Sequence, residues 1–133
     1  MRNAVNGVMT ILVVVGAMAC GDPVALATVE LLEGSWTWVE SSGGIAGETR
    51  TPESTGETMT LRFLGADSVE LTRNGVLAGA TTYQIFFYDD GGSTEIEYAQ
   101  PLFGFASQGL YVGEAELILR DGCCDGFVYE WRR

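Results

Sequence analysis

The residues of this chain with the greatest potential for chemistry are paired acidic side chains. The pairs Glu95/Glu97 and Glu114/Glu116 have the spacing that places two carboxylates on one face of a strand, as general acid–base catalysis requires. Such pairs on a half-exposed strand are far more often simply solvated. The 133-residue chain has no histidine, and its seven basic residues are all arginine, which excludes Ser-His-Asp triads, His-assisted cysteine chemistry and lysine Schiff bases. We therefore expect neither an enzyme nor a cofactor.

Two adjacent cysteines, Cys123 and Cys124, lie in a turn rich in Gly and Asp. A disulfide between them would need an unusual ring, because adjacent Cα atoms lie about 3.8 Å apart, below the usual disulfide range. Without histidine or a second cysteine pair they do not form a zinc site. Two alternatives remain: they are turn thiols, or one of them pairs with Cys20 if Cys20 carries no lipid.

The acidic residues indicate neither a metal site nor a nucleic-acid surface. Asp121, Asp125 and Gly126 show a partial likeness to a calcium loop, but the middle ligand is missing and Arg132 stands where the bidentate Glu is required. We expect no metal site. The formal net charge of −11 makes the chain a poor candidate for binding nucleic acid or anionic lipid surfaces.

The first residues have the pattern of a secretory signal peptide. Arg2 precedes an apolar run over residues 8–18, and small residues follow it. A transmembrane anchor would need about 20 apolar residues, and this run stops short of that length before Gly21. We therefore predict a leader over residues 1–19.

The motif Ala-Met-Ala-Cys at residues 17–20 resembles the lipobox of bacterial lipoproteins, although it has Ala17 where Leu is commonest. The resemblance implies that Cys20 carries acyl chains such as palmitate and that residues 20–32 form a lipidated tether to the membrane. Gly21, rather than Asp, implies a lipid-anchored protein of the bacterial cell envelope, sorted to the outer membrane and facing the periplasm or the exterior. Cleavage at the same site without lipid would release a free secreted protein.

Residues 33–133 form a single domain whose dominant pattern is a period-two alternation of apolar and polar side chains, typical of half-buried strands. Asn74-Gly75 is a favoured hairpin turn, and residues 76–88 read as one long strand. Seven or eight short strands with close turns predict an all-β fold. Because closing the last strand onto the first removes both sheet edges, we predict an eight-stranded antiparallel up-and-down barrel.

Two kinds of segment interrupt this pattern. Residues 41–57 are rich in Gly, Ser, Thr and Pro, and we predict one long connection there that could cover a barrel mouth. Short helical turns are expected only at residues 25–33 and 101–107.

Residues at both ends of the domain resemble the lipocalins and other calycins. Gly34-Ser35-Trp36 looks like their G-x-W motif, and the ending LILRDGCCDGFVYEWRR is similar to the lipocalin-like domain of many small bacterial lipoproteins. This resemblance implies an eight-stranded barrel whose closed end is filled by Trp36. It also implies that a terminal arginine, matched here by Arg133, lies across that tryptophan. Classical lipocalins carry a further helix after the barrel, which we do not expect here.

Seven aromatic residues fall on the apolar phase of their strands, and they either fill the core or line a small cavity with tyrosine hydroxyls. These candidate ligand-binding residues are Trp38, Phe63, Tyr83, Phe87, Tyr98, Phe127 and Tyr129. The resemblance implies binding or carriage of a small apolar ligand in the barrel. The alternative is an interaction or inhibitor module that uses the 41–57 segment, with Arg50, Pro52 and Glu53, and the acidic surface against a basic partner.

Overall fold

The computed structural model describes residues 23–123 and 125–133, and this part of the chain forms two helices and nine strands. The predicted leader, Cys20 and Cys124 lie outside the described residues. The elements in chain order are α1 (Pro23–Leu32), β1 (Gly34–Gly43), β2 (Glu48–Arg50), α2 (Pro52–Thr55), β3 (Met59–Leu64), β4 (Ser68–Arg73), β5 (Val76–Tyr88), β6 (Ser93–Tyr98), β7 (Ser107–Val112), β8 (Glu116–Asp121) and β9 (Phe127–Arg132).

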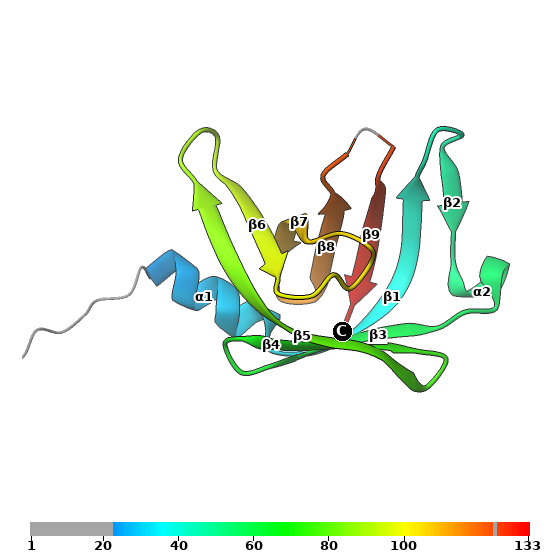
Figure 1. Cartoon of the computed structure of the whole chain (residues 1–133), viewed down its shortest axis with the longest axis horizontal. Helices are drawn as coiled ribbons and strands as arrows, with labels where there is room; N and C mark the ends of the chain where they lie inside the picture. The colour runs from blue at the N-terminus through cyan, green and yellow to red at the C-terminus, as the bar shows by residue number, and fades with distance from the viewer. Residues whose placement is uncertain (1–22, 124) are drawn as a thin grey trace, which may run out of the picture.

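The sheet is a closed antiparallel barrel of eight strands. β1 pairs with β3, each strand from β3 to β8 pairs with the one that follows it, and β9 closes the barrel by pairing with β1. In Figure 1 the green strands β3 and β4 and the first part of β5 lie across the lower edge of the upright strands β1, β6, β8 and β9, and the end of β5 rises beside β6. The remaining strand, β2, pairs only with the last residues of β1. The predicted all-β, eight-stranded up-and-down barrel is confirmed.

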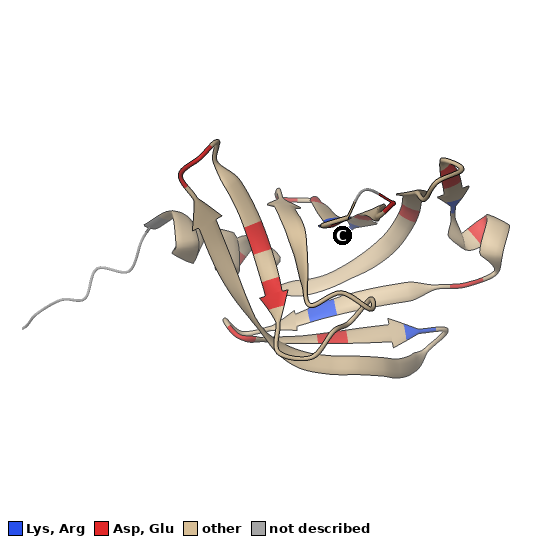
Figure 2. Ribbon diagram, turned by 45° about the horizontal axis from the view of Figure 1, so that its top comes forward, with Lys and Arg blue, Asp and Glu red and all other residues tan. Residues whose placement is uncertain are grey.

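The alternation of side chains separates a buried interior from a charged exterior. Leu61 on β3 and Leu71 on β4 are paired in register on the inner face, and both are almost completely buried. Acidic residues lie on several strands and at the connections (Figure 2). The buried apolar side chains form one core, which consists of Leu32, Trp36, Trp38, Met59, Leu61, Phe63, Val69, Leu71, Tyr83, Ile96, Tyr98, Leu117, Leu119 and Trp131.

A β-bulge in β1 interrupts the simple alternation. The register with β9 shifts between Trp38 and Glu40, so that Trp38 lies opposite Trp131 while Ser41 lies opposite Tyr129. The extra residue lets the strand bend and moves the inward phase by one position. Ser41 is therefore buried among the inner side chains, although an uninterrupted alternation would place it outside.

The segment over residues 41–57 is more ordered than the predicted long connection. β1 continues to Gly43, and β2 returns alongside it as a short hairpin. α2 follows, with Pro52 at its start and Thr51 as its N-cap in a capping box with Ser54. The prediction of one long connection is corrected, because Gly44 and Gly47 form a hairpin turn and Thr51 caps a helix.

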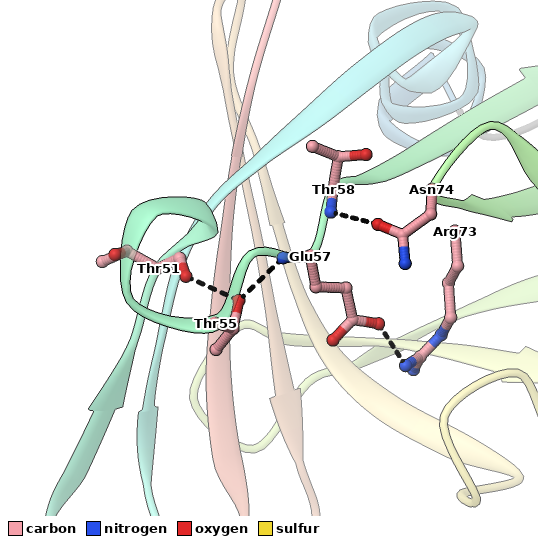
Figure 3. Close-up of polar contacts among 6 residues, drawn as sticks. All are labelled: Thr51, Thr55, Glu57, Thr58, Arg73 and Asn74. Atoms are coloured by element: carbon pink, nitrogen blue, oxygen red, sulfur yellow. Dashed lines mark hydrogen bonds and ion pairs between the residues drawn. The ribbon is translucent and has the colours of Figure 1, made fainter.

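Polar contacts attach the end of this segment to the β4–β5 turn (Figure 3). Thr58 donates its backbone N–H to Asn74 Oδ1 at 2.9 Å, and Asn74 returns a backbone hydrogen bond to Thr58. Glu57 and Arg73 form an ion pair at 2.6 Å. Thr55 also bridges the preceding helix turn, since its hydroxyl donates to Thr51 and accepts from the Glu57 backbone. These contacts fix the loops at this end of the barrel relative to one another.

Residues 23–32, expected to belong to a tether with a short helical turn, form the helix α1. The last residue of the helix, Leu32, is fully buried, and its carbonyl accepts the indole N–H of Trp36 at 2.8 Å. The chain then enters β1 through Gly34, whose φ of +116° favours glycine. Within residues 23–123 and 125–133, no helix has the length and apolar character that crossing a membrane requires.

Arg133 closes this end of the barrel, which we call the base. Its guanidinium carbon lies 4.3 Å from the centre of the Trp36 ring, in the arrangement that the lipocalin resemblance implies. The same side chain donates to the backbone carbonyls of Glu33 at 3.0 Å and Glu114 at 2.6 Å. Arg133 therefore joins the last residue of the chain to the first strand and to the β7–β8 turn.

We expect Arg133→Ala to lower the free energy of unfolding by about 1–3 kcal/mol, since it removes a cation–π contact and two charge-assisted hydrogen bonds. The matched control is Arg132→Ala, because Arg132 makes an exposed ion pair with Glu116 at 3.0 Å and should cost less than about 1 kcal/mol. Urea titrations of the three proteins measure the difference. Equal, small effects of the two substitutions would show that Arg133 does not close the base.

Candidate functional site

The barrel interior gathers five of the seven aromatic residues selected from the sequence. Four of them are buried and Tyr129 is half-buried against the core; the five are Trp38, Phe63, Tyr83, Tyr98 and Tyr129. Phe127 is not among the side chains packed against the core, and the Arg50 guanidinium carbon lies 4.8 Å from the centre of its ring. The rings of Phe63 and Tyr83 meet edge to face with their centres 5.3 Å apart. Phe87 lies apart from this group, since it pairs with Thr94 near the tip of the β5–β6 hairpin, beyond the last paired residue of β4.

The end of the barrel opposite the base, which we call the mouth, is occupied by the β6–β7 connection. This plug segment, residues 99–106, is irregular and not the helical turn expected at residues 101–107. Leu102 reaches the inner face of β5, where a Cβ on Gly79 would lie 3.1 Å from its side chain. Phe103 packs on β9, with ring centres 5.1 Å from Tyr129 and 6.0 Å from Trp131. The chain itself therefore fills the interior near the mouth.

A polar network crosses the inner wall beside the plug segment. The Tyr98 hydroxyl donates to Gln108 Oε1 at 2.8 Å, and Gln108 Nε2 donates to Asp121 Oδ1 at 2.7 Å. The other carboxylate oxygen of Asp121 accepts the backbone N–H of Phe127 at 3.0 Å. The network links β6, β7, β8 and β9. The sequence analysis did not select Gln108, although its position on the apolar phase of its strand indicates an inward side chain.

Burial keeps the interior tyrosines protonated. It raises the pKa of Tyr83 to about 12, with smaller effects of Asp67 and Glu33. Burial also raises the pKa of Tyr98, and the nearby Asp121 carboxylate raises it further. These hydroxyls are therefore neutral hydrogen-bonding groups at physiological pH.

Two indole N–H groups inside the barrel have no hydrogen-bond acceptor among the described residues. They belong to Trp38 and Trp131, which are 3 % and 0 % exposed. Trp36 differs, since its N–H is bound by Leu32. An unpaired buried donor costs about 1–3 kcal/mol, and native proteins hold few of them. The two donors therefore mark a place where an acceptor from outside the chain would lower the free energy.

The acidic pairs do not form a common site. Glu95 and Glu97 lie on the outer face of β6, opposite residues of β5 and β7 that also point outward. Glu116 pairs with Arg132, whereas Glu114 lies in the β7–β8 turn. Among residues 23–123 and 125–133, no group of three acidic or cysteine side chains could hold a metal ion.

A concavity lies on the outside of the barrel, where β6 and β7 separate. The two strands pair only over residues 95–97 and 107–109. Beyond this ladder, a groove of about 550 Å³ opens toward β8, lined among others by Thr94, Tyr111 and Ile118. The groove holds no buried polar group without a partner in the described part of the chain, so the interior is the stronger candidate.

No known protein family, curated protein or solved structure matches the chain. The closed eight-stranded antiparallel barrel is compatible with a lipocalin-like fold, and a barrel of this kind could bind ligands.

We expect the protein to lose stability as the pH rises from about 10 to 12. The pKa of Tyr83 in the folded state lies above its unfolded value, so the unfolded chain loses the proton first and becomes favoured. The chain has no lysine or histidine, so the other side chains that titrate in this range are mainly its four other tyrosines, and burial also raises the pKa of Tyr98 and Tyr129. Tyr83→Phe therefore removes one part of the total loss. Urea midpoints between pH 9 and 12 should fall less steeply for Tyr83→Phe. The exposed substitution Tyr111→Phe is the control, and an unchanged slope in Tyr83→Phe would contradict the assignment.

Proposed function

We propose that this protein is a lipid-anchored protein of the bacterial cell envelope whose lipocalin-like barrel binds a small, largely apolar molecule. The observation that carries the proposal is the pair of buried indole donors, Trp38 and Trp131, inside a closed barrel with aromatic walls. Ligand sites in proteins are mostly apolar, with a few polar groups that orient the ligand. The barrel interior has this composition.

The two ends of the barrel have different roles in this proposal. The base is closed by contacts within the chain. The Trp36 indole N–H donates to the Leu32 carbonyl, and Arg133 lies over the Trp36 ring and donates to the Glu33 carbonyl. The mouth is filled by Leu102 and Phe103, which make apolar contacts that an apolar ligand could replace. The ligand would enter through the mouth and leave the base unchanged.

The membrane partner in this proposal is reached through lipid on Cys20. The motif at residues 17–20 supports acylation, and the cysteine precedes the start of α1 at Pro23 by only three residues. A strongly acidic domain is repelled by anionic head groups, so a covalent anchor would be needed to keep it at the membrane. Gly21 after the cysteine favours the outer membrane.

Mass spectrometry of the protein isolated from its own envelope fraction tests both parts of the proposal. In the denaturing spectrum we expect residues 20–133 plus the mass of two or three acyl chains. In the native spectrum we expect a further mass of a few hundred daltons, which is typical of one small ligand. A denatured mass equal to that of the bare 20–133 chain would overturn the lipid anchor.

A second candidate function is docking to a basic protein partner through the β1–β2 hairpin. Ile45 at its tip is 90 % exposed, and Figure 2 shows acidic residues on β2, on α2 and in the connection to β3. A photo-crosslinking residue at position 45 should then capture one partner, less at high salt because the attraction is electrostatic. Capture that is unaffected by salt, or equal to capture from position 111 on the barrel wall, would contradict this function.

A further inference from the structure

We infer that the indole N–H groups of Trp38 and Trp131 bind a carbonyl-type acceptor on an uncharged ligand, and that Leu102 and Phe103 occupy the place of that ligand in the unliganded protein. The inference rests on the proposed ligand-binding function and specifies the chemical class of the ligand. It uses two observations that are independent of each other, the unpaired donors and the plug segment.

The two unpaired indole donors, Trp38 and Trp131, lie directly opposite each other in the β1–β9 ladder, with both side chains on the inner face. An indole nitrogen can only donate, so its partner must be an acceptor. The other tryptophan, Trp36, shows the satisfied state, since the carbonyl of Leu32 accepts its N–H at 2.8 Å. Two neighbouring donors of this kind select a ligand that carries an acceptor oxygen.

The inward polar side chains of the barrel include Ser41, Gln108 and Asp121. Gln108 and Asp121 are bound to Tyr98 and to the Phe127 backbone, and neither indole N–H has a partner among the described residues. A water molecule would need acceptors for its own two protons, and a wall made mainly of aromatic and aliphatic side chains offers few of them. A carbonyl oxygen accepts hydrogen bonds and has no proton to place. It therefore satisfies the two indoles without creating a new unpaired group.

The negative charge of the domain disfavours an anionic ligand. Asp121 lies on the inner wall, in the row of inward residues next to the mouth. The whole chain carries a formal net charge of −11. A carboxylate or phosphate ligand would have to lose its hydration and pass this carboxylate. An uncharged acceptor, such as a ketone, ester or amide carbonyl, avoids both costs.

The plug segment is held at its flanks by backbone hydrogen bonds from Tyr98 to Ala106 and from Ala99 to Thr82. Its centre is held by apolar contacts, including that of Phe103 with the ring of Trp131. Phe103 therefore covers one of the two donor residues. A ligand that reaches the Trp131 indole must displace the phenyl ring, and it recovers similar apolar contacts when it does.

Three naphthalene probes of nearly equal size test the ligand class by equilibrium dialysis. They are 2-acetylnaphthalene with a carbonyl, 2-ethylnaphthalene without one, and the anion 2-naphthoate. We expect the wild-type protein to bind 2-acetylnaphthalene most tightly. Trp38→Phe and Trp131→Phe keep an aromatic ring but remove the N–H. Each should lower the affinity for 2-acetylnaphthalene roughly fivefold. The affinity for 2-ethylnaphthalene should change little.

Matched variants separate the ligand contacts from general effects on folding. Trp36→Phe removes an N–H that is already bound within the chain, so the preference for the carbonyl probe should persist. Phe103→Ala should raise the affinity for both neutral probes several-fold, because the phenyl ring that competes with them is gone. Phe105→Ala, on the same segment but outside the side chains packed against the core, should leave the affinities unchanged. Circular dichroism confirms that each variant is folded.

The outcomes distinguish the inference from the function on which it rests. If the neutral probes bind but the two tryptophan substitutions weaken both equally, the indoles are only an apolar wall and the inference is overturned. Equal or tighter binding of 2-naphthoate would overturn the uncharged class. If no probe binds to the wild type or to Phe103→Ala, the barrel is a filled core, and the proposed function itself fails.

Discussion

The antiparallel ladder between β1 and β9 joins residues 37–43 to residues 127–132 and turns a twisted sheet into a barrel. Closure leaves no free edge along the eight strands, and it forces every second side chain into a narrow interior. The interior is filled mainly by apolar and aromatic groups. The bulge after Trp38 is part of the same ladder, since it lets β1 bend around the barrel while keeping both Trp38 and Ser41 inside.

Inside such a closed space, each polar group must find its partner locally. At the base this condition is met: the Trp36 indole binds a helix-end carbonyl, and Arg133 covers the ring. It is met again in the network of Tyr98, Gln108 and Asp121. It is not met at the Trp38 and Trp131 indoles. The contrast separates a structural base from a middle region that is suited to a guest molecule.

The sequence predicts the barrel well because period-two alternation and hairpin turns are local signals. The contact of Arg133 with Trp36 follows from the resemblance to calycins, because alternation alone does not indicate that these two side chains meet. The interior of the mouth could not be predicted. The inward course of residues 99–106 depends on space opposite Gly79, and the Gln108–Asp121 bond joins residues 13 positions apart. The hairpin within residues 41–57 was missed because its strand of three residues is too short to show a period.

The state of the two inner indoles is the central claim, and the ¹H–¹⁵N signals of the three tryptophan side chains report it directly. Each signal is assigned from its Trp→Phe variant. We predict that 2-acetylnaphthalene moves the Trp38 and Trp131 N–H signals downfield, as hydrogen bonding to a carbonyl does, and leaves Trp36 in place. Signals of Trp38 and Trp131 that stay unchanged with bound probe, or that respond in the same way to 2-ethylnaphthalene, would contradict the account.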